Sequence, residues 1–316
     1  MVLNVAYSSD DNYLKHVMAS LLSLLDHNRE FEVINVYLLC NGIESSNREK
    51  LIELVKNTNA NIHFLELSSV RDKIRTDGSF SISSFGRLFL GELVPGCRII
   101  YMDCDSIVNG SLMPLVQMDM GECVCAAAQD NVSEYFKVVL GNAPDSRYFN
   151  AGFLVIDLSK WNALRMQDKA IAVIEEFHGG VPHQDQGVIN KICYGKIMRL
   201  HPKYNFQCPM FEMKPEHLVK LIPDYYSEQE LKEAKESPVF IHFTEGFSNR
   251  PWRKGCTHPY AGLYRKYLDM TPYKGYIEDA RINKNAEIVK WFYYNTPFPV
   301  YRLFCKLIEM KKRLYR

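Results

Sequence analysis

The chain has 316 residues, of which 47% are hydrophobic and 24% are charged. These proportions are those of an ordinary globular protein and exclude a disordered or collagen-like chain. The formal net charge of +1 provides no overall basic field, which argues against a nucleic-acid partner. The length corresponds to about two domains, or to one α/β domain with a smaller appendage.

The neutral total hides a basic C-terminal end. Residues 300–316 contain six basic residues and one acid, a net charge of +5, so the rest of the chain sums to −4. Segment 288–316 also contains seven aromatic residues between Trp291 and Phe304. Aromatic rings beside lysine and arginine fit a helix that lies on an anionic membrane surface. A terminal helix packed on the main domain, with a solvated cationic end, is the alternative.

The cysteines and the start of the chain indicate a cellular compartment. Nine scattered cysteines without a Cys-x-x-Cys pair predict free thiols in a reducing cytosol. The first residues lack the positive start and apolar stretch of a signal peptide, and no run approaches the ~18 apolar residues of a spanning helix. We therefore expect a cytoplasmic protein whose sequons at Asn109 and Asn131 are not glycosylated.

The first hundred residues alternate between two periodicities. Residues 2–7, 33–39 and 61–65 are short apolar runs, whereas 12–25 and 43–55 carry apolar residues at helical spacing. This alternation predicts right-handed crossover units that build a mainly parallel, Rossmann-like sheet flanked by helices.

The middle of the chain predicts further elements and then an irregular region. The expected helices are 83–93, 168–177 and 184–193, and the expected strands are 98–102, 123–128, 152–157 and 239–242. Between residues 198 and 236 the sequence is proline-rich and aromatic, which favours loops that form a pocket wall.

Asp103 and Asp105 directly follow the strand expected at 98–102. Ligands bind at the carboxyl ends of strands in open α/β sheets, and side chains two residues apart point to the same side. Both carboxylates can therefore reach one hard divalent cation. A simple turn is the alternative, and so is a HAD-type phosphatase with Asp103 as nucleophile, although that class begins its chain with the motif.

The segment after the first expected strand can bind a nucleoside. It contains Ser8, Ser9, Asp10, Asp11, Asn12 and Tyr13. It has neither a Gly-x-Gly-x-x-Gly fingerprint nor a Walker lysine, but its polar groups can bond a base or ribose and its tyrosine ring can stack. Capping of the following helix by Asp10 or Asp11 is the alternative.

Two more segments can contact a sugar. Asn150, Ala151 and Gly152 precede a strand, where small residues permit close approach and an amide can bond hydroxyls. Asp185 and Gln186 begin a helix and can offer a charge or a carbonyl dipole to an oxocarbenium-like carbon. A turn and a helix cap are the respective alternatives.

His242 ends the last expected strand, and a loop with Gly246 leads from it to Arg250. A lone histidine is more often a packed structural residue. Imidazole added to two carboxylates nevertheless shifts the expected metal from Mg²⁺ towards Mn²⁺, and the arginine can clamp a diphosphate.

In order and spacing these segments resemble the family 8 retaining glycosyltransferases. The family has a GT-A fold and includes bacterial lipopolysaccharide galactosyl- and glucosyltransferases and glycogenin. The matching segments, which span most of residues 1–252, are 8–13, 85–88, 101–105, 149–152, 184–190 and 242–252.

The resemblance implies a set of site residues. Asp103, Asp105 and His242 would hold Mn²⁺, with Mg²⁺ as the alternative, and Asp185 and Gln186 are the catalytic candidates. The implied donor-binding residues are Ser8, Ser9, Asp10, Asp11, Asn12, Tyr13, Arg87, Asp103, Cys104, Asp105, Asn150, Ala151, Gly152, Asp185, Gln186, Gly246 and Arg250.

It also implies an organisation and a partner set. Residues 1–280 would form the GT-A catalytic domain, with a nucleotide-binding half at 1–110 and a donor and acceptor half at 111–280. Residues 281–316 would form a small helical appendage that is basic and aromatic. The partners would be a UDP-sugar and a glycan or glycolipid acceptor. The composition of 288–316 adds the expectation of an anionic membrane surface, on the inner face of the cell membrane.

Two departures from the family pattern affect the expected chemistry. The loop after His242 is two residues longer than usual, and its lysine is replaced by Arg250. The usual Asp-Gln-Asp is Asp185-Gln186-Gly187, so the second acid is missing. We therefore expect transfer of galactose or glucose by same-face attack, with a non-catalytic UDP-sugar-binding module as the alternative.

Overall fold

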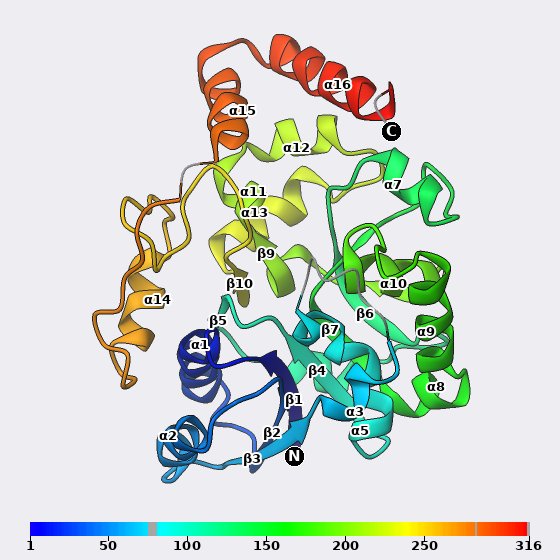
Figure 1. Cartoon of the computed structure of the whole chain (residues 1–316). Helices are drawn as coiled ribbons and strands as arrows, with labels where there is room; N and C mark the ends of the chain where they lie inside the picture. Colours follow the sequence, from blue (N-terminus) through cyan, green and yellow to red (C-terminus); the bar gives the residue numbers. More distant parts are fainter. Residues whose placement is uncertain (75–80, 282, 315–316) are drawn as a thin grey trace.

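The computed structural model describes residues 1–74, 81–281 and 283–314 (Figure 1). A seven-stranded sheet has the order β3-β2-β1-β4-β7-β6-β8, in which β7 runs antiparallel to both of its neighbours and the other pairs are parallel. Its strands are β1 (Val2–Ser9), β2 (Val33–Cys40), β3 (Ala60–Glu66), β4 (Arg98–Met102), β6 (Cys125–Gln129), β7 (Phe149–Asp157) and β8 (Ile197–Arg199). The predicted mainly parallel sheet is confirmed.

One face of the sheet is covered by the first two helices, α1 (Leu14–His27) and α2 (Ser45–Val55) (Figure 1). Leu3, Val5 and Tyr7 alternate along β1 and pack on this side with residues of both helices. Ala6, between them, joins the opposite core. Burial on both faces explains why the strands read as continuous apolar runs.

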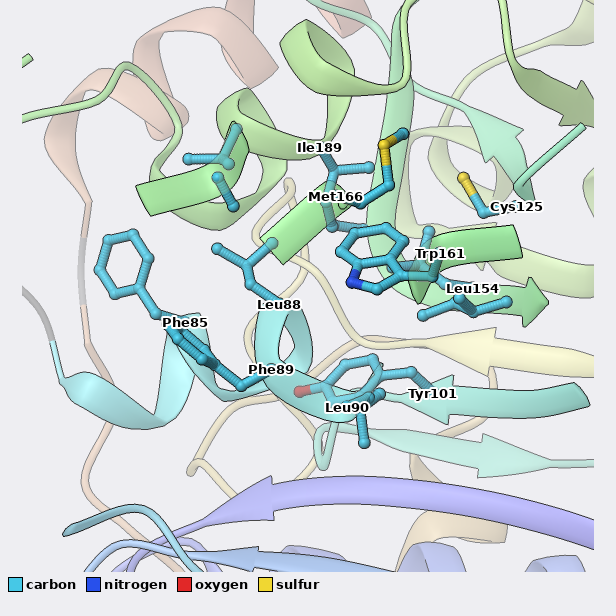
Figure 2. Packing of buried hydrophobic residues seen from close by; sticks show 14 of the residues in the cluster. Phe85, Leu88, Phe89, Leu90, Tyr101, Cys125, Leu154, Trp161, Met166 and Ile189 are labelled. Carbon is cyan, nitrogen blue, oxygen red and sulfur yellow. The ribbon is translucent and has the colours of Figure 1, made fainter. Parts of the chain in front are cut away.

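The opposite face is covered by a larger set of helices. Its core packs Phe85, Leu88 and Trp161 with Ile189 against the sheet (Figure 2). The helices near this face are α3 (Ser68–Arg71), α4 (Ile82–Phe85), α5 (Leu90–Leu93), α8 (Leu158–Ala163), α9 (Met166–Glu176) and α10 (Gln184–Ile192). Two further short helices lie elsewhere along the chain, α6 (Met113–Gln117) and α7 (Glu134–Val139).

The single helix expected over 83–93 is wrong in detail. The segment forms α4, a 3₁₀ turn η1 (Gly86–Phe89) and α5 in succession. A Cβ on Gly86 would lie 2.9 Å from Ser8 Oγ, so this turn packs directly on the end of β1. That close approach places Arg87 beside Asp103, the residue that follows β4.

A second, small sheet joins distant parts of the chain. Its strands are β5 (Ser106–Val108), β10 (Phe240–His242) and β9 (Phe206–Gln207), in that order. His242 pairs with Ser106 across the antiparallel ladder. This pairing sets the end of β10 beside the segment that leaves β4.

The loops expected between residues 198 and 236 are a wrong prediction. The region contains η2 (Pro202–Asn205), α11 (Cys208–Glu212), α12 (Pro215–Leu221) and α13 (Glu228–Glu236). Prolines occupy the first turns of η2, α11 and α12. There the missing N–H costs nothing, so these prolines begin helical turns instead of preventing them.

The C-terminal part is helical, as expected. It contains α14 (Ala261–Leu268), α15 (Lys284–Asn295) and α16 (Phe298–Leu314), and the last two lie beside α12 at one end of the molecule (Figure 1). Tyr301 of α16 is buried in the third core cluster. Three of the six basic residues in 300–316 have side chains outside the described part of the structure, namely Lys312, Arg313 and Arg316.

Two predictions from the composition can be compared with the fold. All nine cysteines are free thiols. Among the described residues, none of the helices combines the length and apolar character needed to cross a bilayer.

Candidate active site

A cleft of about 600 Å³ opens at the carboxyl ends of β1 and β4. There the strand order reverses, because β1 has β2 on one side and β4 on the other. The loops leaving the two strands diverge at such a switch point and leave a crevice for ligands. The described lining residues are Ser8, Ser9, Asp10, Tyr13, Ser81, Ser83, Ser84, Arg87, Tyr101, Asp103, Cys104, Asp105, Ala151, Gly152, His183, Gln184, Asp185, Gln186 and Arg250.

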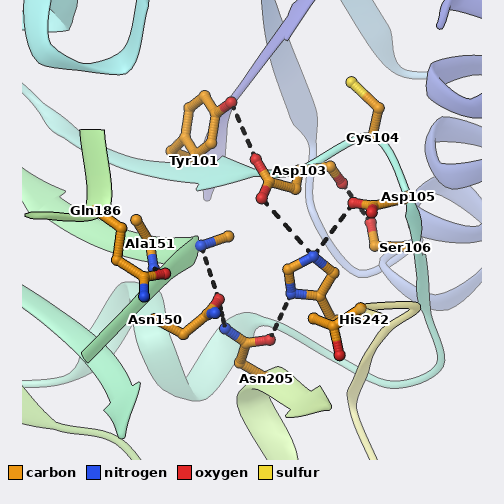
Figure 3. Close-up of polar contacts among 12 residues, drawn as sticks. Tyr101, Asp103, Cys104, Asp105, Ser106, Asn150, Ala151, Gln186, Asn205 and His242 are labelled. Atoms are coloured by element: carbon orange, nitrogen blue, oxygen red, sulfur yellow. Dashed lines mark hydrogen bonds and ion pairs between the residues drawn. The ribbon is translucent and has the colours of Figure 1, made fainter. Parts of the chain in front are cut away.

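Asp103, Asp105 and His242 form a three-residue cluster at this cleft (Figure 3). One ligand atom from each lies within 4.8 Å of the others, and His242 Nε2 is 3.2 Å from Asp105 Oδ1 and 3.7 Å from Asp103 Oδ2. A Cβ on Gly152 would lie 2.2 Å from His242 Cε1, so a glycine is needed here to leave room for the imidazole ring. Two carboxylates and one imidazole suit Mn²⁺ or Mg²⁺.

The cluster's carboxylates are held by cations from two other segments. Burial opposes ionisation of Asp105, but Arg250 and His242 outweigh it and hold the pKa of this carboxyl below its usual range. Burial likewise favours a neutral His242, yet Asp105 and Asp103 raise the pKa of the imidazole. Arg250 pairs directly with Asp105. Asp105 is therefore ionised at neutral pH, as a carboxylate ligand of a divalent cation must be.

Arg87 lies behind the cluster and is only 6% exposed. Its guanidinium is 2.8 Å from Asp103 Oδ1, 3.0 Å from Asp185 Oδ2 and 4.0 Å from the centre of the Tyr101 ring. Burial opposes its charge, but the two carboxylates raise the pKa of Arg87 above its usual value. One cation thus links a metal-site carboxylate to a catalytic candidate.

Asp185 and Gln186 stand at the start of α10, after two residues in left-handed conformation, His183 (φ 56) and Gln184 (φ 55). Burial raises the pKa of Asp185 to about 6, although Arg87 acts against the rise. The N-cap residue of α10 is His183, which makes no side-chain cap bond, so Asp185 does not occupy the N-cap position.

The missing second acid has a steric cause. A Cβ on Gly187 would lie 1.9 Å from the carbonyl oxygen of Pro182. No side chain fits there without moving the backbone. The first turn of α10 therefore excludes a carboxylate at this position.

Only part of the segment predicted to bind a nucleoside lines the cleft. Ser8, Ser9, Asp10 and Tyr13 line the cleft. The Asp11 carboxylate turns towards α2, where it accepts from the Glu44 N–H at 3.2 Å and the Asn47 amide at 2.8 Å, and neither it nor Asn12 is among the described lining residues. The α1 N-cap is Tyr13 and has no side-chain bond. The Asp10 carboxylate accepts the Tyr13 N–H at 3.1 Å and so caps the turn that leads into α1, whereas Asp11 does not cap the helix.

Two other predicted residues lie behind or beside the cleft. Asn150 is 7% exposed and bonds to other side chains, while its neighbours Ala151 and Gly152 line the cleft. Gly246 lies in a second cavity of about 400 Å³ that shares Arg250 with the first. Arg250 is therefore the residue of that loop that reaches both cavities.

The sequence reasoning missed three polar residues near the site. Asp130 accepts from Asn150 at 2.9 Å and from Gln186 at 3.0 Å, and Asn205 lies 3.1 Å from His242. Glu212 accepts the backbone N–H groups of residues 247 and 248. Asp130 had a signal, because it follows a buried strand as Asp103 does. Asn205 and Glu212 had none, since they lie in the region expected to be loops.

The fold and this cleft define a glycosyltransferase of the GT-A class. The sequence profile of Glycosyl transferase family 8 matches residues 4–256. The chain therefore belongs to family 8, and the phosphatase alternative is not supported by the match.

Relatives and solved structures agree with this family. The chain is 26% identical over 279 residues to General stress protein A of Bacillus subtilis, covering 85% of the chain and 94% of that protein. It is 26% identical over 280 residues to the lipopolysaccharide 1,2-glucosyltransferase of Escherichia coli, covering 86% and 79%. The galactosyltransferase LgtC, solved with donor and acceptor sugar analogues, superposes with a TM-score of 0.72 at 22% identity, covering 90% and 98%.

Proposed function

We propose that this protein transfers galactose or glucose from a UDP-sugar to a hydroxyl group of a glycan or glycolipid, with retention and with Mn²⁺ or Mg²⁺ bound. One observation carries the proposal: Asp103, Asp105 and His242 converge at a cleft that also contains Arg87 and Arg250. Metal ligands and two arginines in one cleft suit the diphosphate of a nucleotide sugar.

The donor would lie along this cleft. Ser8, Ser9, Asp10 and Tyr13 would contact uridine, and Arg250 the diphosphate, since all line the same cavity. Arg87, Ala151, Gly152 and the Asp185-Gln186 pair would surround the sugar, with Asn150 supporting them from behind. The lining position of Cys104 supports its inclusion in the donor site, whereas Asp11, Asn12 and Gly246 would act through neighbouring residues.

The chemistry requires stabilisation of the departing diphosphate. When bound, a divalent cation supplies Lewis-acid neutralisation of the charge on that group. Arg250 adds a fixed positive charge on the same side, and Arg87 holds the sugar-facing carboxylate Asp185 in place. Gln186 presents a carbonyl dipole to the sugar carbon as that carbon becomes electron-poor.

Same-face attack is favoured over double displacement. A nucleophilic carboxylate must be free to bond the sugar carbon, but Asp185 is paired with Arg87 and both oxygens of Asp130 already accept hydrogen bonds. The acceptor hydroxyl would therefore attack from the side that UDP leaves and pass its proton to the departing phosphate. A trapped glycosyl adduct on Asp185 would contradict this mechanism.

We further propose a biosynthetic role and a cellular location for the reaction. Two relatives are named as lipopolysaccharide glycosyltransferases, which supports cell-surface polysaccharide or lipopolysaccharide synthesis at the cytoplasmic face of the membrane. Residues 1–280 would be the catalytic domain, with halves at 1–110 and 111–280, and 281–316 the membrane-facing appendage.

The exposed surface of α16 supports this arrangement. Val300, Leu303, Leu307 and Met310 are between 47% and 59% exposed and recur at helical spacing, so they form one apolar stripe. Arg302 and Lys306 are also exposed. An apolar stripe beside cations fits an anionic lipid surface.

A panel of nucleotide sugars tests the reaction. Purified protein with Mn²⁺ should release UDP from UDP-galactose or UDP-glucose faster than from GDP- or ADP-sugars, and NMR of a transferred product should show the anomeric configuration of the donor. A chain that binds UDP without turnover on any of these donors would instead be a non-catalytic binding module.

Vesicle sedimentation tests the membrane contact. The full chain should sediment with anionic vesicles and much less with neutral ones. The triple variant Leu303→Gln, Leu307→Gln, Met310→Gln should lose this binding, whereas Ile52→Gln, an equally exposed residue of α2, should keep it. Equal sedimentation of the triple variant would contradict the proposal.

A further inference from the structure

A chain of hydrogen bonds joins the candidate metal ligand His242 to the catalytic candidate Gln186. Figure 3 shows its part from His242 through Asn205 to Asn150. The hydrogen-bond chain runs from His242 Nδ1 to Asn205 (3.1 Å), from Asn205 to Asn150 (2.8 Å), from Asn150 to Asp130 (2.9 Å) and from Gln186 to Asp130 (3.0 Å). Asn205 is fully buried and His242 is 4% exposed. Nothing in the family match assigns a role to Asn205.

Backbone groups determine the direction of every bond in this chain. The Gly152 N–H can only donate, so the Asn150 atom 2.9 Å away is the amide oxygen. That oxygen also faces Asn205, whose nearer atom must therefore be the amide nitrogen. The oxygen of Asn205 then faces His242, and Nδ1 of the imidazole must be the donor.

The other end of the chain is fixed in the same manner. The Ala151 N–H donates to Gln186 Oε1 at 3.1 Å, so the Gln186 nitrogen points to Asp130. Asp130 accepts from Asn150 as well. Two adjacent N–H groups of β7, those of Ala151 and Gly152, thus orient both ends of the network.

We propose that Asn205 is a positioning residue that fixes the tautomer of His242. With the proton held on Nδ1, the lone pair of Nε2 faces Asp103 and Asp105, where a divalent cation would bind. A metal-ligating histidine needs such a second hydrogen bond to fix its ring and tautomer. This inference rests on the metal-dependent function proposed above.

The fold holds Asn205 rigidly for this task. It ends η2, and β9 follows at once with Phe206 and Gln207 paired in parallel to Ile241 and His242. The same pairing of β9 with β10 therefore holds Asn205, directly before β9, and His242, at the end of β10. Rigid placement of Asn205 keeps the imidazole oriented in the metal-free protein, which lowers the entropy cost of metal binding.

Mn²⁺ affinity measured by electron paramagnetic resonance, without donor, tests this role. Asn205→Leu keeps the approximate volume but loses the acceptor, and it should weaken Mn²⁺ binding about 10- to 100-fold. Asn205→Asp keeps an oxygen acceptor for His242 but loses the donor to Asn150, so it should recover only part of the affinity. Asn28→Leu is the matched control: Asn28 is equally buried and bonded at both amide ends, far from the site, and its loss should leave Mn²⁺ affinity unchanged.

Long-range ¹H–¹⁵N NMR of the wild type loaded with diamagnetic Mg²⁺ gives a readout that needs no variant. The proton of the neutral His242 ring should lie on Nδ1. Protonation on Nε2, or equal Mn²⁺ affinity of wild type and Asn205→Leu, would overturn the role of Asn205 while leaving the proposed function intact. A wild type that binds neither Mn²⁺ nor Mg²⁺, with or without UDP, would overturn both.

Discussion

Position 187 illustrates how one backbone contact limits the chemistry of the site. The carbonyl oxygen of Pro182 occupies the space that a side chain would need. Restoring the family's acid with Gly187→Asp should therefore damage α10 instead of adding a catalytic group. Overpacking of this kind costs about 1–3 kcal/mol, and more where backbone must move.

Thermal unfolding checks this expectation. Gly187→Asp and Gly187→Ala should both lower the melting temperature by several degrees. Gly262→Ala is the matched control, because a Cβ at this helical glycine meets nothing within 4 Å and should raise stability by up to about 1 kcal/mol. A Gly187→Asp variant as stable as the wild type and more active would contradict the steric account.

Asp185 gives the metal-free protein a pH-dependent stability. Its pKa is about 6 in the folded state, against an ordinary value of 3.8, because it is buried and shares Arg87 with Asp103. The folded protein holds this proton more tightly than the unfolded chain, so the unfolding free energy should fall as pH rises from about 4 to about 6. The loss should be roughly 1–3 kcal/mol.

Urea unfolding in the presence of a chelator measures this loss. Asp185→Asn cannot titrate, so its unfolding free energy should fall less over the same range, even if the two proteins differ at the acidic end. Parallel pH profiles for wild type and variant would show that Asp185 titrates at its ordinary value.

The sequence predicted the charged residues of the site better than its polar support. Asp103, Asp105 and His242 converge as expected, because strand ends meet at one edge of the sheet. Asp11 and Asn12 are expected in the donor site because they lie in the segment that resembles the family, but neither the resemblance nor periodicity indicates that the Asp11 carboxylate bonds to α2.

At the level of elements, the loop from β10 to Arg250 is held by side chains of two helices. Glu212, the last residue of α11, accepts from Phe247 N at 2.7 Å and from Ser248 N at 2.6 Å. Lys290 of α15 also bonds the Phe247 carbonyl, at 3.2 Å. The longer loop is thus held in place by α11 and α15.

Hydrogen exchange checks this support. Glu212→Gln should lower protection of the Phe247 and Ser248 amides and weaken UDP binding by up to about 10-fold, since hydrogen bonds to a charged group contribute about 1.5–3 kcal/mol. Glu228→Gln, an exposed glutamate of α13, should change neither quantity. Unchanged exchange in Glu212→Gln would show that the loop is held by other contacts.

Element types were predictable where the periodicity was long and uninterrupted. The expected strand at 98–102 matches β4, and 184–193 matches α10 within one residue. Between residues 198 and 236 the prolines predict interruptions, whereas Pro202, Pro209 and Pro215 each stand in the first turn of a helical segment.

On the scale of the whole molecule, the order of the strands creates the site. The reversal between β1 and β4 opens the cleft, and β10 returns from far along the chain to bring His242 to it. Alternation of strands and helices predicted the layered sheet, but the antiparallel insertion of β7 and the small second sheet depend on long-range pairing that no local pattern encodes.

The metal dependence of donor hydrolysis tests the central claim most directly. UDP release from the preferred UDP-sugar should require Mn²⁺ or Mg²⁺, cease with a chelator, and fall on the order of 100-fold or more in Asp105→Asn. Asp119→Asn, at an exposed position, should behave as wild type. Undiminished hydrolysis with the chelator, or full activity of Asp105→Asn, would contradict a metal-dependent glycosyltransferase site at Asp103, Asp105 and His242.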